Sequence, residues 1–220
     1  QGLDADVCDA RDILPETDII QRYRSDKRFA MFANYFRLSL LRHGKGAWVD
    51  LDCLMLKPLD TKSGYLFGYS SRTKLNNAVL GLPADSPMLT DYMAAIWADP
   101  LHTPWSTFGR WAKREIEILS GHSLPATTVR TNVGPRALTY FARKHGVIKY
   151  AEPRDVFYAI PTASADLFFR PDDRVTERLT PRTVLVHLWK GRIRRHGYLS
   201  EPPPATSYLG KACRQYDIAT

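Results

Sequence analysis

The sequence predicts a single-domain α/β protein, because segments of strand character alternate with segments of helical periodicity along its 220 residues. Two observations carry this prediction. A helix-like segment over 29–42 leads through a glycine turn into an apolar run that ends in two acids, and alternating segments then continue to residue 188. The length suits one sizeable domain, and the apolar fraction of 44% is ordinary for a globular protein.

Helical periodicity and capping residues mark four segments. We expect helices over 29–42, 87–98, 107–119 and 135–144. Phenylalanines recur at helical spacing in the first, which Gly44 can end. The second has Ser86 as an N-cap and Pro87 at its first position.

Short β-branched and aromatic runs, bounded by turn residues, mark the strands. We expect strands over 47–50, 65–69, 78–82, 156–160 and 183–188. Residues 201–220 contain a run of three prolines at 202–204 and are expected to form an irregular tail. The predicted organisation is therefore a main domain over 1–200 followed by a tail over 201–220.

The chain is basic, with a formal net charge of +8 and a late cluster of Lys190, Arg192, Arg194 and Arg195. Nucleic acid, a nucleotide diphosphate and an anionic membrane surface all suit this charge. No apolar run approaches the roughly 18 residues of a membrane span. The three cysteines, Cys8, Cys53 and Cys213, match no zinc spacing and favour neither a disulfide framework nor an oxidising compartment.

Asp50 and Asp52 are the most informative residues, because they lie one residue apart within an otherwise apolar segment. An unpaired carboxylate is costly to bury, and a divalent cation removes that cost. Mg²⁺ and Mn²⁺ bind through one or two carboxylates together with substrate phosphates. The pair therefore predicts a metal-diphosphate site at a strand end. A solvated loop is the alternative, since such triplets are common.

Arg37 comes thirteen residues before Asp50, and the intervening turn could bring it beside the strand end. Its planar guanidinium suits phosphate or sugar hydroxyls. Asn34, one helical turn earlier, can act with it. The alternative is a surface arginine on an amphipathic helix.

Asn76 and Asn77 precede a predicted strand, and their amides suit sugar hydroxyls, although turn residues are an equal alternative. The run 131–135 opens a predicted helix, where free N–H groups suit ligand oxygens or simple capping.

His187 ends an apolar run and is a candidate third metal ligand. Trp189 could stack on a base or sugar. Both residues could instead be ordinary packed side chains.

The ordered set of these motifs resembles the DXD-containing sugar transferases. The leading blocks are 32–38, 46–52 and Lys57-Pro58, and weaker matches follow at 76–80, 134–139, 157–161 and 186–189. The resemblance covers about Val7 to Gly197. The family includes capsule and polysaccharide glycosyltransferases, α1,4-galactosyltransferases, yeast mannosyltransferases and, more distantly, clostridial toxin glucosyltransferase domains.

This resemblance implies a GT-A-type fold, with a Rossmann-like mixed sheet flanked by helices. It implies a hexosyltransferase that moves a sugar, with retention, from a nucleotide-diphosphate donor such as a UDP-sugar. Asp50, Asp52 and Arg37 would carry catalysis, and Asp52 and His187 would hold Mn²⁺ or Mg²⁺. The donor contacts would be Asn34, Arg37, Asp50, Asn76, Asn77 and Trp189.

The implied acceptor is a saccharide, a lipid-linked sugar or a protein, and no nucleic acid is expected. A bacterial protein of this kind would be cytoplasmic, with peripheral membrane association left open, and a eukaryotic one would lie in the Golgi lumen. The sequence departs from the family at Asn34, where many relatives have Asp. We also expect no counterpart of the family's front strand, which holds the nucleotide base, so that either the sequence is truncated or nucleotide binding is incomplete. The alternative is therefore a non-catalytic transferase domain that binds sugar or a partner.

Overall fold

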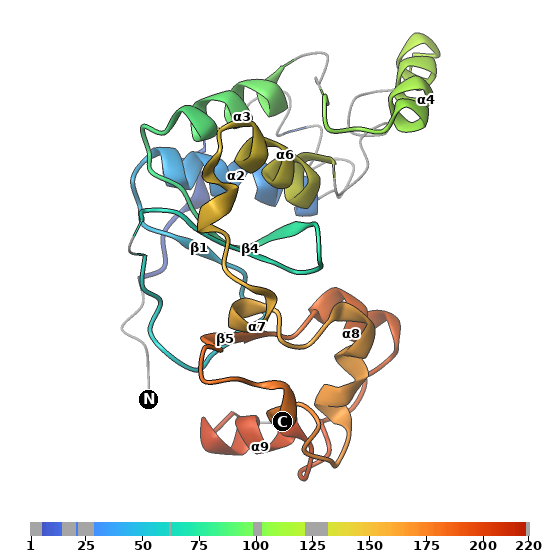
Figure 1. The fold of residues 1–220 in the computed structure, drawn as a ribbon. Coiled ribbons are helices and arrows are strands. Elements are labelled where there is room, and N and C mark those ends of the chain that lie inside the picture. The colour runs from blue at the N-terminus through green and yellow to red at the C-terminus, as the bar shows by residue number, and fades with distance from the viewer. Residues whose placement is uncertain are drawn as a thin grey trace.

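The computed structural model describes residues 6–14, 21, 29–61, 63–98, 103–121 and 132–218. These residues form a mixture of helices and short strands, which confirms the predicted α/β class at that level. Figure 1 shows an upper part in which helices cover a small sheet, and a lower part built around a second pair of strands. The chain passes from the upper to the lower part at the two acids.

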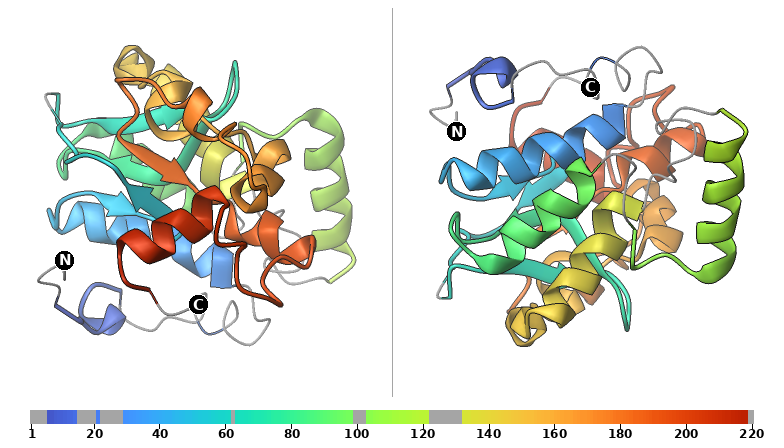
Figure 2. Two further views of the ribbon diagram at one scale, coloured as in Figure 1. Left: turned by 90° about the horizontal axis from the view of Figure 1, so that it is seen from below. Right: turned by 90° about the horizontal axis from the view of Figure 1, so that it is seen from above.

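Three helices cover one face of the upper sheet and lie beside one another in Figure 2. They are α2 (Phe29–Arg42), α3 (Pro87–Trp97) and α6 (Ala137–Lys144). The predicted limits of α2 are confirmed. In α3, the Ser86 hydroxyl accepts a hydrogen bond from the Leu89 N–H at 3.3 Å, so the predicted cap is also confirmed.

The predicted helix over 135–144 begins two residues later than expected. A wide turn, η2 (Asn132–Arg136), precedes α6, and Gly134 within it has non-helical backbone angles. Residue 131, part of the predicted ligand-binding run, lies outside the described residues. The helix α4 (Phe108–Leu119) has nearly its predicted limits and projects away from the upper part (Figure 1).

The described strands form two small sheets with antiparallel pairing. The upper sheet has the order β1-β4-β3, with β1 (Trp48–Val49), β3 (Leu66–Tyr69) and β4 (Leu75–Gly81). The lower pair is β2 (Cys53–Met55) and β5 (Leu185–His187). A parallel bridge joins Gly68 to Glu152 outside these ladders.

Strand β4 begins three residues before its predicted start. Asn76 and Asn77 therefore lie inside the strand, where Gly68 pairs with Asn76. The expectation that the two asparagines precede the strand, as turn residues would, is wrong. Asparagine has a low strand propensity, but the pairing of this end of β4 with β3 overrides that local preference.

The predicted strand over 156–160 is wrong. This segment begins within α7 (Arg154–Phe157) and continues as buried, irregular chain. Pro153 precedes the helix and lacks the N–H that a strand ladder needs. Because Val156, Phe157 and Tyr158 are all buried, the apolar run reflects burial on every side, and its pattern does not distinguish a strand from a helix.

The lower part is mostly helical. Its elements are η4 (Thr162–Phe169), η5 (Thr176–Arg178), α8 (Lys190–Arg195) and α9 (Tyr208–Gln215). Two short helices, η1 (Ala10–Asp12) and η3 (Val147–Tyr150), belong to the rest of the chain. The tail was expected to be irregular, which holds for the proline run, but α9 follows it and packs against η4.

Three clusters of buried apolar side chains support this arrangement. The largest lies between α2, α3, α6 and the upper sheet, and includes Tyr35, Leu38 and Tyr92. A second lies in the lower part around Phe168 and Val186. The third contains residues of both sheets and of α7, so it joins the two parts. None of the described helices is both long and apolar enough to cross a membrane.

Candidate functional site

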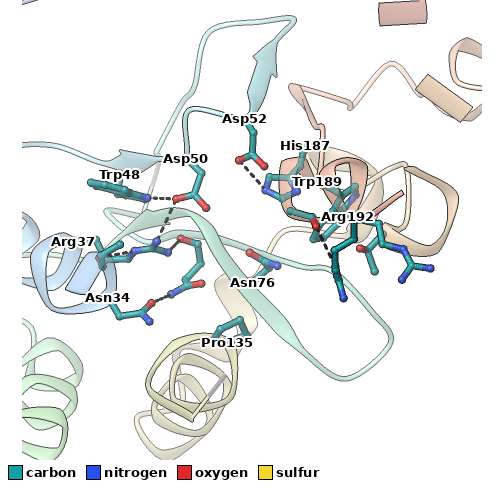
Figure 3. A pocket seen from close by; sticks show the side chains of 15 residues that line it. Asn34, Arg37, Trp48, Asp50, Asp52, Asn76, Pro135, His187, Trp189 and Arg192 are labelled. Atoms are coloured by element: carbon teal, nitrogen blue, oxygen red, sulfur yellow. Dashed lines mark hydrogen bonds and ion pairs between the residues drawn. The ribbon is translucent and has the colours of Figure 1, made fainter. Parts of the chain in front are cut away.

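A cavity of about 490 Å³ lies where the upper and lower parts meet (Figure 3). Its lining comes mainly from α2, β1, β4, β5 and α8 and from the turn that carries the two acids, with single residues from η2, η4 and the link between β5 and α8. The residues that line it are Ala33, Asn34, Arg37, Trp48, Asp50, Asp52, Asn76, Asn77, Pro135, Thr162, His187, Trp189, Gly191, Arg192 and Arg195. The carboxylates, amides, arginine, histidine and tryptophan predicted for the site therefore all lie on this one cavity. Of the predicted run 131–135, Pro135 lines the cavity, and 132–134 are not among the lining residues.

The two acids lie on a tight turn that connects the sheets. Asp50 continues from β1, and its N–H donates to the Ala78 carbonyl at 2.7 Å. The Cys53 N–H then donates back to the Asp50 carbonyl at 3.2 Å as β2 begins. Leu51 between the acids points into solvent. The chain thus turns at the acids, and this turn directs the two carboxylates to different partners (Figure 3).

Asp50 belongs to the upper wall. Its carboxylate lies 3.2 Å from the Arg37 guanidinium and also accepts a hydrogen bond from the Trp48 indole N–H. The guanidinium lies over the Trp48 ring, 5.0 Å from its centre, and donates to the Ala33 and Asn77 carbonyls. Only 7% of the Arg37 side chain is exposed, so the alternative of a surface arginine is wrong.

Asn34 and Asn77 form a buried pair behind Arg37. The Asn77 amide donates to the Asn34 side-chain oxygen at 2.9 Å. Gly134 lies against both, since a Cβ there would be 3.2 Å from Asn34 Oδ1 and 3.3 Å from Asn77 Nδ2. Asn76, by contrast, is only half-buried and accepts from the Ala78 N–H at 2.8 Å, and it lines the cavity.

Asp52 belongs to the lower wall, because β2 pairs with β5 directly after it. The register places Cys53 opposite His187, and the Leu188 N–H donates to the Asp52 carbonyl at 2.8 Å. The Asp52 carboxylate lies 3.4 Å from His187 Nε2 and accepts from the Lys190 N–H at 2.8 Å. Residues 135 positions apart in sequence therefore meet through strand pairing.

Partial burial alone would raise the pKa of Asp52. The contact with His187 and the Lys190 N–H outweigh burial, so the pKa of this carboxyl is lowered. Asp52 is therefore an anion across the ordinary pH range, as a ligand for a hard cation must be.

Asp52, Cys53 and His187 form a group, found among the residues that the structure describes, whose donor atoms could hold a metal ion. These atoms lie within 4.8 Å of one another. Burial, together with the charges of Asp52 and Asp50, raises the pKa of the Cys53 thiol to about 12. A protonated thiol is a poor ligand for Mg²⁺ or Mn²⁺. The carboxylate and the imidazole fit a divalent cation, and the nitrogen donor favours Mn²⁺ over Mg²⁺.

His187 and Trp189 are held by their surroundings. The two rings lie 4.1 Å apart at an angle of 83°, and the Trp189 N–H donates to the Ile160 carbonyl at 2.8 Å. Trp189 has a left-handed backbone conformation, with φ of 58°, which turns the chain from β5 into α8. Within the described part of the chain, His187 Nδ1 is buried and has no hydrogen-bond partner.

Sequence reasoning missed several lining residues. Trp48 was treated only as an apolar neighbour of the acids, although its N–H fixes the Asp50 carboxylate. Arg195 and Thr162 were not assigned to the site. The late basic cluster was a signal for Arg195, but the sequence alone does not separate Arg192 and Arg195, which line the cavity, from the exposed Arg194.

No family model, curated protein or solved structure matches this chain.

Proposed function

We propose that this protein is a glycosyltransferase that uses a divalent cation and a nucleotide-diphosphate sugar, with UDP as the expected nucleotide. One observation carries the proposal. Two carboxylates separated by a single residue face one cavity, and each has a different set of partners: Arg37 and Trp48 for Asp50, and His187 and the Lys190 N–H for Asp52. This division matches the roles that the resemblance implies for the two acids.

Asp52 and His187 would hold Mn²⁺ or Mg²⁺ together with diphosphate oxygens. The bound cation supplies Lewis-acid stabilisation of the departing nucleotide diphosphate. The Lys190 N–H and the paired strands β2 and β5 orient Asp52 for this role. A fixed ligand loses little conformational freedom when the cation binds.

The positive charge for the diphosphate comes from α8. Arg192 and Arg195 line the same cavity as His187. Positive groups beside a leaving group stabilise the charge that develops on it. Arg37 has a different role in this proposal from the catalytic one expected from sequence, because its guanidinium already binds Asp50 and two carbonyls. It positions Asp50.

Asp50 and Asn76 would contact the donor sugar and ribose from the upper wall. Both present polar atoms at the cavity, and carboxylate and amide groups suit hydroxyls. The finer proposals from the resemblance are a GT-A-type fold, retention of configuration, and a saccharide, lipid-linked or protein acceptor. A cytoplasmic or Golgi location and peripheral membrane association are also proposals from the resemblance.

The decisive experiment is thermal unfolding with UDP, GDP and CMP compounds, each with and without Mn²⁺. We expect UDP and Mn²⁺ together to raise the midpoint by about 5 °C when both are far above their dissociation constants. Asp52→Asn should remove this shift and any Mn²⁺-dependent hydrolysis of the donor. Asp60→Asn is the matched control, since Asp60 is exposed and outside the cavity.

Three other outcomes of these experiments would each lead to a different conclusion. Donor binding that needs Mn²⁺ but leads to no hydrolysis or transfer with any acceptor would favour the non-catalytic sugar-binding alternative. Salt-dependent DNA or RNA binding that survives in an Asp50→Asn/Asp52→Asn variant would favour a nucleic-acid module. A shift that persists unchanged in Asp52→Asn would refute the proposed metal site.

A further inference from the structure

The helix α4 carries an apolar face that the rest of the described chain leaves exposed. Phe108, Ile116 and Leu119 are 79%, 65% and 86% exposed, respectively. Figures 1 and 2 show α4 standing at the edge of the molecule in every view, and among the described elements none packs extensively against it. Large apolar side chains gathered on one face in this way indicate an interaction surface.

The sequence of α4 is strongly amphipathic. At 100° per residue, positions 108, 112, 116 and 119 fall within an arc of about 80°, and they hold Phe, Ala, Ile and Leu. The twelve residues of α4 include three basic residues (Arg110, Lys113 and Arg114) and two acidic ones (Glu115 and Glu117), so the helix has a net positive charge. An amphipathic helix with an exposed apolar face and a net positive charge is typical of helices that lie in the plane of a membrane surface.

A basic cavity adjoins the start of α4. Its volume is about 610 Å³, and it is lined by Thr107, which directly precedes the helix, and by Lys74, Arg136, Arg143 and Lys144. Trp105 and Tyr140 supply an aromatic side to the cavity. Asp91 binds Lys144 at 2.6 Å, and Arg143 donates to the Thr73 carbonyl. The four basic residues outnumber the one acid that pairs with them, and this excess positive charge suits anionic headgroups near the helix.

We infer that α4 is a membrane-docking helix that inserts Phe108, Ile116 and Leu119 into the surface of an anionic bilayer. The basic cavity beside it binds lipid phosphate. Apolar burial supplies affinity, and the charge of +8 supplies the preference for anionic lipid. The inference does not depend on the proposed transferase activity.

A second copy of the chain is the main rival for this face. A helix of this length is only about 18 Å long and about 10 Å wide, so its face is far smaller than the roughly 800 Å² per partner of a standard interface. A bilayer sets no such minimum area, because it adapts to the inserted side chains. The flanking basic residues would also repel the same residues of a second copy.

The test is co-sedimentation of the full chain with vesicles of phosphatidylcholine alone and of phosphatidylcholine mixed with phosphatidylglycerol. We expect binding to the mixed vesicles, weakening with salt. Ile116→Gln/Leu119→Gln should reduce the partition coefficient at least about tenfold, because two apolar side chains no longer insert. The control Leu199→Gln/Ile218→Gln changes residues 51% and 57% exposed elsewhere and should bind normally.

A second pair of variants tests the phosphate contacts. Lys74→Gln/Arg143→Gln should reduce the preference for phosphatidylglycerol and leave residual apolar binding. Asp52→Asn should bind vesicles as the parent does, which separates this inference from the proposed function. Equal sedimentation of the parent and the Ile116→Gln/Leu119→Gln variant would overturn the inference. So would a parent dimer that this variant dissociates, with no vesicle binding by either.

Discussion

Arg37 organises the upper wall of the cavity at the scale of a single residue. Its guanidinium bridges the Asp50 carboxylate, directly after β1, the Asn77 carbonyl on β4 and the Ala33 carbonyl of its own helix. The Trp48 ring covers it from one side. Because the fork of donors is planar and fixed, it sets the separation of α2, β1 and β4 as well as the orientation of Asp50.

Replacing Arg37 with Met should destabilise the protein by about 2–4 kcal/mol. The change removes the guanidinium from the partly buried Asp50 carboxylate, which keeps the Trp48 N–H, and from the Ala33 and Asn77 carbonyls. Buried polar groups that lose a charged partner are costly to the folded state. Urea denaturation measures the loss. Arg37→Lys should recover little, because an ammonium cannot reach three acceptors in a plane. Arg42→Met, on the same helix, should cost about 1 kcal/mol or less; equal losses would contradict this role for Arg37.

At the scale of elements, local signals succeed where a cap or a turn residue dominates. The limits of α2 and α3 follow from periodicity, Ser86 and Gly44. Local signals fail for the buried run that begins in α7. They also fail for α9, because the proline run before it suggested irregular chain. Ser207 caps α9 by accepting the Gly210 N–H at 3.1 Å, a signal that the preceding prolines obscured.

Gly210 allows α9 to approach the proline run closely. A Cβ at this position would lie well inside contact distance of the Pro204 carbonyl oxygen, which is backbone and cannot rotate away. Gly210→Ala should therefore cost about 2 kcal/mol, in spite of the better helix propensity of alanine. Gly109→Ala in α4 is the control, since nothing lies within 4 Å of its Cβ. Thermal unfolding should show a lower midpoint for the first variant only.

At the scale of the whole molecule, α7 connects the two parts that enclose the cavity. Its apolar residues pack with those of both sheets. Asp155 in its first turn binds Arg182 through two hydrogen bonds, of 3.0 and 3.1 Å, and accepts from the Thr180 hydroxyl at 2.8 Å. These contacts attach α7 to the segment that leads into β5, and so help to set the distance between the walls.

Asp155 should make stability depend on pH. Partial burial alone would raise its pKa, but the hydrogen bonds from Thr180 and Arg182 and the Arg182 charge together lower the pKa below 3.8. A lowered pKa in the folded state stabilises the protein above pH 3.8, and this contribution is lost as the pH falls through the folded pKa.

The measurement is urea denaturation of the parent and of Asp155→Asn as a function of pH. The difference in unfolding free energy should be constant between about pH 5 and pH 8, and should shrink below pH 3.8. A difference that stays constant down to the lowest pH would show that the carboxylate charge is not what stabilises the folded state. Asp217→Asn, at an exposed position near the end of the chain, should show no such dependence.

The sequence by itself determined the α/β class, the helices α2 and α3 and the residues of the candidate site. Hydrophobic periodicity, capping residues and two acids within an apolar segment are local signals, because each depends on residues that are close together in the sequence. The cavity itself depends on tertiary structure. The antiparallel pairing of β2 with β5 brings His187 to Asp52, and the path of α2 buries Arg37 against Asp50. Such contacts join residues far apart in sequence, and only the packing of the whole chain decides between their possible partners.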